Sequence, residues 1–149
     1  MWADYYYNQN ELVKIKFNNG INTRYDYDNF INNWKELYES KKKFSFIFNT
    51  LNTSLVNPYY CYLMANFISD LKKNEIQYLN FSVIIVKNVA VRILLNIIFG
   101  IQKPVAPVYL IENKKKNELL INDIVNTISS NELKKILENN REIFTIINI

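Results

Sequence analysis

The fold of this chain is decided by FSFIF at residues 44–48, FSVIIV at 81–86 and VYLI at 108–111. Each run is short, carries no charge and consists mainly of aromatic, β-branched or other apolar residues. Strands have this composition when helices cover both faces of their sheet. Segments with apolar residues at helical spacing separate the runs. Residues 44–111 therefore predict an α/β fold with a mostly parallel central sheet and helices packed on it.

The segment before these runs predicts an antiparallel N-terminal hairpin and a first helix. Residues 12–17 alternate between apolar and polar side chains, as in a strand with one buried face. Asn18-Asn19-Gly20 is typical of a tight hairpin turn, because asparagine and glycine tolerate positive φ. Residues 21–25 would form the return strand. Asp28 is then expected to cap the first helix.

Capping residues predict the later helices. Asn57 precedes Pro58 at the expected start of a second helix, and Asn88 is expected to cap a third. A fourth helix is expected at 117–128, and Ser129-x-x-Glu132 is a capping box for a short fifth helix. The apolar tail at 143–149 would add an edge strand or dock on a partner. We interpret residues 1–149 as one domain, with a core at 12–128 and a C-terminal helix and tail at 129–149.

Composition limits the partners and the compartment. The chain has 149 residues and a net charge of +4, and its basic runs at 41–43 and 114–116 fit solvated loop ends better than a nucleic-acid surface. Its apolar stretches are shorter than the ~20 residues of a membrane span. A single cysteine, Cys61, fits a reducing, cytoplasmic location. Heavy use of Asn, Ile, Lys and Tyr is typical of an AT-rich genome, such as that of a large DNA virus, a protist or a low-GC bacterium; a viral protein would lie in host cytoplasm or virion.

The side chains argue against most enzymes. The chain has no histidine, which removes the usual general base and the commonest metal ligand. Only Gly20 and Gly100 exist, so glycine-rich phosphate loops are missing. We expect no catalytic residue, cofactor or metal site, since an enzyme would depend on Asp, Lys, Tyr or Cys61 alone. Asp26 and Asp28 are interpreted as a capping cluster or paired carboxylates, and Cys61 as a buried apolar residue or a reactive thiol.

The best candidate binding site follows the first of the three runs. In open α/β sheets, ligands bind beyond the carboxyl ends of the strands, and helix N-termini attract anions. The alternative is that the polar residues here only satisfy loop backbone. Tyrosines are enriched in protein interfaces, and those at 59, 60 and 62 cannot all point inward on a helix. Tyrosines 5–7 add to such a surface or form an arm folded across the domain. The candidate residues for binding a partner or ligand are Asn49, Thr50, Asn52, Thr53, Ser54, Asn57, Tyr59, Tyr62 and Asn88.

The order of these segments resembles the STAS domain, the fold of bacterial anti-sigma-factor antagonists and of sulfate-transporter tails. The resemblance covers residues 12–128 and lies in the pattern of hairpin, strands and helices. The order around residues 77–101 is also similar to the CRAL-TRIO lipid-binding fold. Regulatory STAS domains carry an Asp-Ser-Ser-Gly-like segment, phosphorylated on serine, at the start of the second helix. The matching positions here read Val56-Asn57-Pro58-Tyr59, so we expect the phosphoserine switch to be absent.

Together, the pattern and the resemblance imply a non-catalytic, STAS-like interaction or regulatory module. Its partner would be another protein or a second copy of the chain, met through the second helix and the loop before it. The alternative is a small-ligand binder. That ligand would be an anionic nucleotide at the 49–57 loop or a lipid in a CRAL-TRIO-like cleft.

Overall fold

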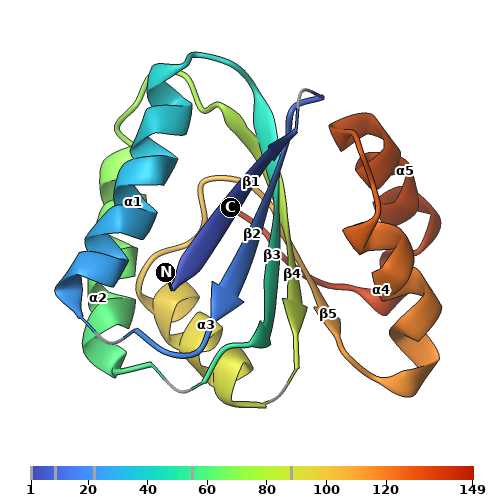
Figure 1. Cartoon of the computed structure of the whole chain (residues 1–149). Helices are drawn as coiled ribbons and strands as arrows, with labels where there is room; N and C mark the ends of the chain where they lie inside the picture. Colours follow the sequence, from blue (N-terminus) through green and yellow to red (C-terminus); the bar gives the residue numbers. More distant parts are fainter. Residues whose placement is uncertain (1, 9, 22, 55, 88) are drawn as a thin grey trace.

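A six-stranded mixed sheet forms the centre of the molecule (Figure 1). The computed structural model describes residues 2–8, 10–21, 23–54, 56–87 and 89–149. The strands lie in the order of the sequence, and the four central ones are parallel while both edge strands are antiparallel. The predicted α/β fold is therefore confirmed. The strands are β1 (Ala3–Asn8), β2 (Leu12–Asn18), β3 (Phe44–Asn52), β4 (Leu79–Val86), β5 (Val108–Glu112) and β6 (Thr145–Ile147).

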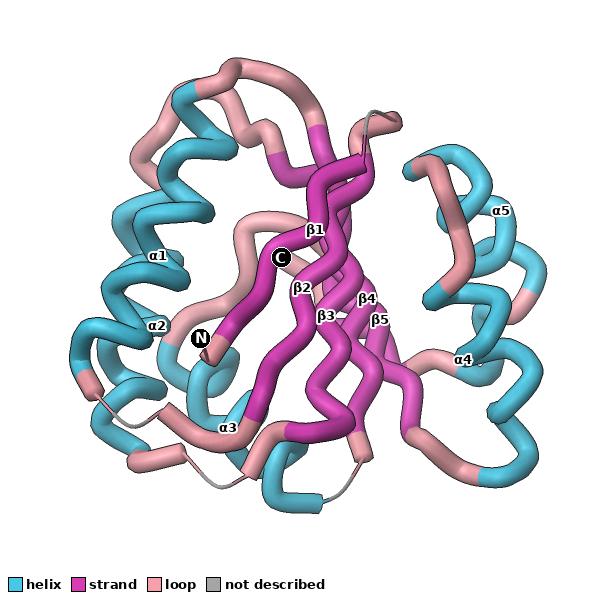
Figure 2. The backbone as a smooth tube through the Cα atoms, viewed as in Figure 1, coloured by secondary structure: helices cyan, strands magenta, loops and turns pink. Residues whose placement is uncertain are grey.

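The helices form a layer on each face of this sheet (Figure 2). Successive parallel strands are joined by α1 (Arg24–Glu39), α2 (Pro58–Leu71) and α3 (Val89–Ile101), which all lie on one face. A right-handed crossover that always moves to the next strand puts each helix on the same side. After β5 the chain crosses to the other face, where α4 (Glu118–Val125) and α5 (Ser130–Asn139) pack. Short 3-10 turns at Lys115–Asn117 and Arg141–Ile143 flank these two helices.

The two faces of β3 fill two different hydrophobic clusters. Phe46 and Phe48 point to the α1–α3 side, where Trp34 meets Phe46 edge to face at 4.9 Å between ring centroids. Ile47 points to the other side and joins the cluster that contains Leu133 of α5. Residues 44–48 are all buried, which is why this run carries no charge.

The N-terminal hairpin is present, but other residues form it. Its partner strands are β1 and β2, whereas the expected return strand at 21–25 is wrong. β2 has β1 on one edge and β3 on the other, so no edge is free for a strand after Asn18-Asn19-Gly20. Asn19 does take the expected positive φ, but the chain turns there toward α1.

The helix starts were predicted in part. α1 begins at Arg24 with Thr23 as its N-cap and Asp26 closing a capping box, so Asp28 is not the cap. Asn57 and Pro58 start α2 as expected. Ser129 caps α5 through the Glu132 N–H, and the predicted edge strand in the tail is β6. The expected Asn88 cap lies outside the described residues.

Candidate functional site

The loop expected to bind a ligand is shorter than predicted, because β3 extends to Asn52. Asn49 accepts the Leu51 N–H with its Oδ1 atom at 3.1 Å, and buried Thr50 donates its hydroxyl to the Ile85 carbonyl at 2.6 Å. Asn57 accepts the Tyr59 N–H at 3.0 Å as the cap of α2. The side chains of Asn49, Thr50 and Asn57 therefore satisfy backbone groups, which was the alternative interpretation.

The remaining polar residues of this segment lie around an open hollow. Asn52, Thr53 and Ser54 line it together with Lys87, which follows β4, and with Asn18 and Asn19 at the end of β2. The hollow thus lies beyond the carboxyl ends of three neighbouring strands, the expected edge of an α/β sheet. Of the described residues that line the hollow, Lys87 is the one with a positive charge. Binding of an anionic nucleotide here stays a prediction, and Asn88 lies outside the described residues.

The two tyrosines predicted to meet a partner are exposed at the start of α2. Tyr59 is 47% exposed and Tyr62 is 58% exposed, and the i, i+3 spacing puts both on the outer face of the helix. The Tyr59 hydroxyl accepts a hydrogen bond from Arg24 Nη1 at 3.2 Å, which ties the start of α2 to α1. Tyr60 instead turns inward and packs on Tyr27, with 5.6 Å between ring centroids.

The N-terminal tyrosines belong to β1 and lie across their own domain. Tyr5 points inward, where its hydroxyl donates to the Phe30 carbonyl at 2.7 Å, and burial raises its pKa well above the usual range. Tyr6 and Tyr7 are exposed, and the Tyr7 hydroxyl donates to Asn33 Oδ1 at 3.2 Å. Residues 5–7 thus form part of an edge strand of the domain, and a role for exposed Tyr6 and Tyr7 in docking stays a prediction.

Helix α3 is the feature that sequence reasoning missed. Val91 is the one buried residue of this helix, while Val89, Ile93 and Ile101 are exposed by 70%, 52% and 50%. A helix with apolar residues on all sides is normally buried on all sides. α3 packs against α2 on one side and is the last helix of its layer, and its outer side carries exposed apolar residues. Its nearly uninterrupted apolar sequence was the available signal.

The single charge of α3 is paired. Arg92 forms an ion pair with Glu112 at the end of β5, and Lys114 Nζ lies 2.9 Å from the other oxygen of Glu112. The Arg92 side chain is still 40% exposed, and exposed Asn96 is a second polar residue on the outer part of α3. We call the exposed set of Tyr59, Tyr62, Val89, Ile93 and Ile101 the α2–α3 surface.

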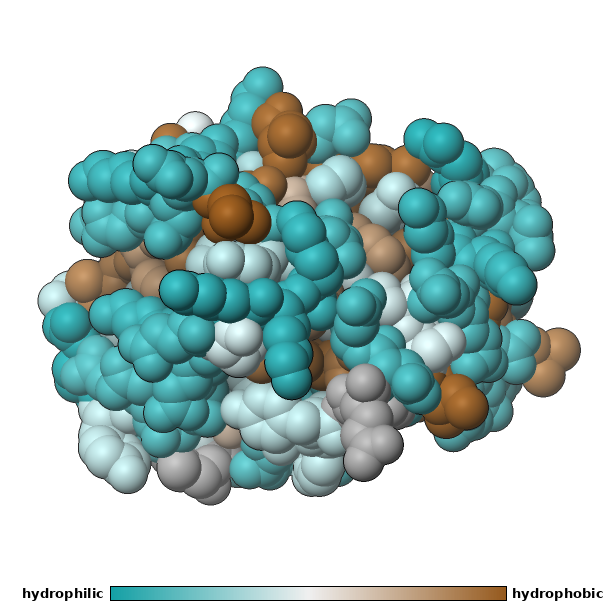
Figure 3. Space-filling view, turned by 90° about the horizontal axis from the view of Figure 1, so that it is seen from above, coloured by the Kyte–Doolittle hydropathy of each residue, from teal (hydrophilic) through white to brown (hydrophobic). Residues whose placement is uncertain are grey.

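One end of the molecule has a different kind of surface. Figure 3 views the molecule from above, toward the end where α1 finishes and β3 begins. That face is mainly hydrophilic, and apolar side chains occur on it only in small separate spots.

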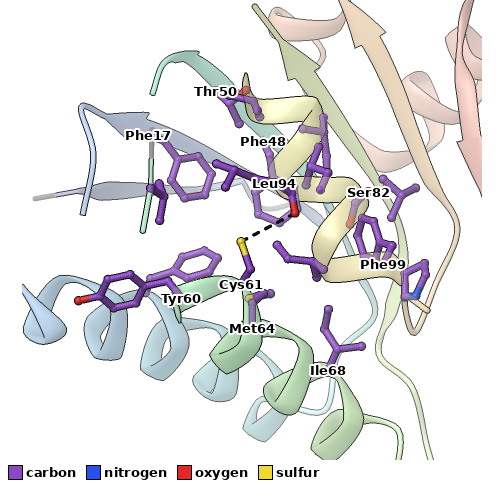
Figure 4. A pocket seen from close by; sticks show the side chains of 18 of the residues that line it. Phe17, Phe48, Thr50, Tyr60, Cys61, Met64, Ile68, Ser82, Leu94 and Phe99 are labelled. Atoms are coloured by element: carbon purple, nitrogen blue, oxygen red, sulfur yellow. Dashed lines mark hydrogen bonds between the residues drawn. The ribbon is translucent and has the colours of Figure 1, made fainter. Parts of the chain in front are cut away.

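A cavity of about 160 Å³ lies under α3, between α2, α3 and the sheet. Figure 4 shows Cys61, Met64 and Ile68 projecting from α2 toward α3, with Phe48 on the sheet side. The wall is almost entirely apolar, and the cavity is partly open to solvent.

Cys61 is buried in that wall. Its Sγ donates a weak hydrogen bond to the Leu94 carbonyl at 3.9 Å, and burial raises the pKa of the thiol. A raised pKa leaves less of the nucleophilic thiolate at neutral pH. The interpretation of Cys61 as a small buried residue is confirmed.

Metal sites and membrane spans are absent from the described ranges. No cluster of three or more His, Cys, Asp or Glu side chains there could hold a metal ion. No described helix combines the length and apolar character required to cross a membrane. The groups on this side of the sheet include aromatic rings and aliphatic side chains. They also include charged residues such as Arg24, Asp28, Lys35 and Asp70, which line a groove between α1 and α2.

Comparison with models of known protein families gave no match, and comparisons with curated proteins and with solved structures gave no significant match either. The STAS and CRAL-TRIO resemblances therefore stay predictions from the order of the segments.

Proposed function

We propose that this chain is a non-catalytic interaction module that binds a protein partner through the α2–α3 surface. One observation carries the proposal: a helix of thirteen residues, with one charge, leaves its outer side uncovered. Contiguous exposed apolar surface is rare on monomeric proteins and commonly marks an interaction site.

The chemistry of the α2–α3 surface fits a protein partner. Tyr59 and Tyr62 present large rings with a polar tip, and Ile93 and Ile101 present aliphatic side chains. Aromatic residues at the centre of an interface supply most of its binding energy, and charged residues are depleted there. The contact of Tyr59 with Arg24 holds one ring in place before a partner arrives, which lowers the entropy lost on binding.

The predicted fold type supports the same proposal. The STAS-like order of elements implies a regulatory module that acts by contact with another protein. Residues 56–59 contain no serine at the position where STAS domains are phosphorylated. We therefore propose that binding of the partner does not depend on phosphorylation at the start of α2. The partner is a second protein or a second copy of this chain.

Substitution of Ile93 by glutamate tests the proposal. Ile93→Glu puts a charge in the middle of the α2–α3 surface, where desolvating it in an interface costs binding energy. We expect at least about a tenfold loss of partner recovery, equivalent to about 1.4 kcal/mol. Quantitative mass spectrometry of complexes purified from the native cell measures it, and sedimentation of the pure chain tests for self-association.

Two matched variants control for the change of charge. Ile76→Glu alters a residue that is 54% exposed at the other end of α2, and Leu119→Glu alters an exposed residue on α4 across the sheet. Both controls should keep the partner and the oligomeric state. Equal recovery with Ile93→Glu and the controls, together with an unchanged sedimentation coefficient, would remove the α2–α3 surface from consideration.

A further inference from the structure

We propose that the cavity under α3 is a binding site for a small, uncharged and largely apolar molecule that carries one hydrogen-bond acceptor. This site is separate from the α2–α3 surface: it lies on the inner side of α3, facing the sheet. Three observations carry the proposal, namely the size of the cavity, the chemistry of its wall and the polar atoms left without partners beside it.

The size of the cavity selects small molecules. A dry apolar cavity of about 150 Å³ holds a ligand such as benzene. The volume here, about 160 Å³, therefore suits roughly six to ten non-hydrogen atoms. A long acyl chain is too large for the cavity as it stands.

The wall excludes charged ligands. Its side chains are mainly aliphatic and aromatic, including Ile84 and Val108 of the sheet and Leu95 and Phe99 of α3. The Thr50 hydroxyl beside them already donates to the Ile85 carbonyl. Moving an ionised group from water into such surroundings without a partner costs far more free energy than apolar contacts with the wall contribute.

Unpaired polar atoms point to an acceptor on the ligand. Among the residues that the structure describes, three buried side-chain atoms have no hydrogen-bond partner: Nε1 of Trp2, Nε1 of Trp34 and Oγ1 of Thr53. All three residues line this cavity, but the three atoms themselves are covered by neighbouring groups, so a ligand reaches one only after its side chain tilts toward the cavity. Buried polar groups are nearly always paired, and leaving one unpaired is destabilising. An indole N–H can only donate, so a bound molecule that pairs with either tryptophan must offer an acceptor.

The wall is also able to admit a ligand. The cavity is already partly open to solvent. Several lining residues of α3, such as Leu94, Leu95, Ile98 and Phe99, are only half-buried. This is the part of the molecule where entry costs least.

Acetophenone and ethylbenzene form a matched pair of probes for this site. They are similar in size, but only acetophenone has an acceptor oxygen. The chain contains two tryptophans, Trp2 and Trp34, and both line the cavity, so intrinsic fluorescence of the full chain reports binding directly. We expect saturable binding of both probes with a Kd of about 1 mM or tighter, and tighter binding of acetophenone by about threefold or more.

Benzoate and palmitate complete the panel. Neither should bind at the same site, because benzoate is charged and palmitate exceeds the volume. Absence of saturable binding by both neutral probes would overturn the proposal, and equal affinity for both would overturn the acceptor. Competition by palmitate would replace the proposal with lipid binding.

A filled cavity provides the structural control. Val105 is a half-buried lining residue before β5, and Val105→Trp should abolish probe binding measured by calorimetry. Val125 is a half-buried residue of α4 on the other face of the sheet. Val125→Trp makes the same change there and should leave probe binding intact. If Val105→Trp fails to fold, Met64→Phe at another half-buried lining position takes its place and should weaken binding. Unchanged binding in a folded filled variant would show that the probes bind elsewhere.

Discussion

Ser45 and Ser130 form a buried side-chain hydrogen bond between β3 and α5. Their Oγ atoms lie 2.9 Å apart, and both residues are buried. This pair joins residues 85 positions apart in the sequence and anchors the start of α5 to the sheet. The Ser130 N–H adds a second anchor by donating to the Asn10 carbonyl at 3.1 Å.

Removal of both hydroxyls of this pair should destabilise the fold less than the sum of the two single removals. Ser45→Ala leaves the Ser130 hydroxyl buried without a partner, and we expect a loss of about 1–3 kcal/mol in the free energy of unfolding. Ser45→Ala with Ser130→Ala should lose less than the sum of the single variants. Urea unfolding of the four proteins measures this coupling. Additive losses would mean that the two hydroxyls do not stabilise each other.

Single residues also show which sequence signals were dependable. Asn57 and Ser129 cap helices as expected, because capping needs only neighbours within three positions. Asn18-Asn19-Gly20 has the right local conformation at Asn19, yet it does not form a hairpin. A turn residue fixes a local direction, but the strand that pairs afterwards is chosen by the rest of the sheet.

At the scale of elements, α5 and β6 are expected to be indispensable for the second hydrophobic cluster. Leu133 and Leu137 of α5 are almost fully buried there, and Phe144 before β6 joins them. β6 also pairs with β5 at the edge of the sheet. The C-terminal segment at 129–149 therefore packs as part of the domain.

A chain that ends at residue 128 should lose most of its stability. Burial of each large apolar side chain contributes about 1.5–3 kcal/mol, so losing Leu133, Leu137 and Phe144 removes about 4.5–9 kcal/mol. That is comparable to the whole stability of a typical domain. Urea unfolding followed by circular dichroism measures it, and removal of only the exposed residues 148–149 is the control. A truncated chain with an unchanged unfolding midpoint would make 12–128 the folding unit.

Buried acidic hydroxyls and the thiol are spread over the whole α1–α3 side of the molecule. Burial raises the pKa of Tyr38 to about 12, and it also raises the pKa of Tyr27, Tyr5 and Cys61. In the unfolded chain these groups ionise near their ordinary values of 10.0 and 9.0. The native state therefore holds protons that the unfolded state releases.

The free energy of unfolding should consequently fall in alkaline solution. A raised native pKa contributes stability that is complete below the unfolded pKa and is lost as pH rises through the native value. We expect little change between about pH 6 and pH 8 from these groups, and a progressive loss above about pH 9. Urea unfolding at a series of pH values measures the slope. Tyr38→Phe should reduce it, whereas Tyr25→Phe, at an exposed position, is the control; equal slopes would contradict the assignment.

The sequence by itself determined the α/β fold. The unbroken apolar runs at 44–48, 81–86 and 108–111 are buried on both faces when a helix layer covers each side of the sheet. It also determined the starts of α2 and α5, since capping depends on near neighbours. The exposure of Tyr59 and Tyr62 was decided by the tertiary structure. Only the tertiary structure decided that β1 pairs with β2 in the hairpin, that Asn49 and Thr50 belong to strand β3, and that α3 is the last helix of its layer. Those outcomes depend on which edges and faces remain free after all the strands have paired, a property of the assembled sheet that no single segment contains.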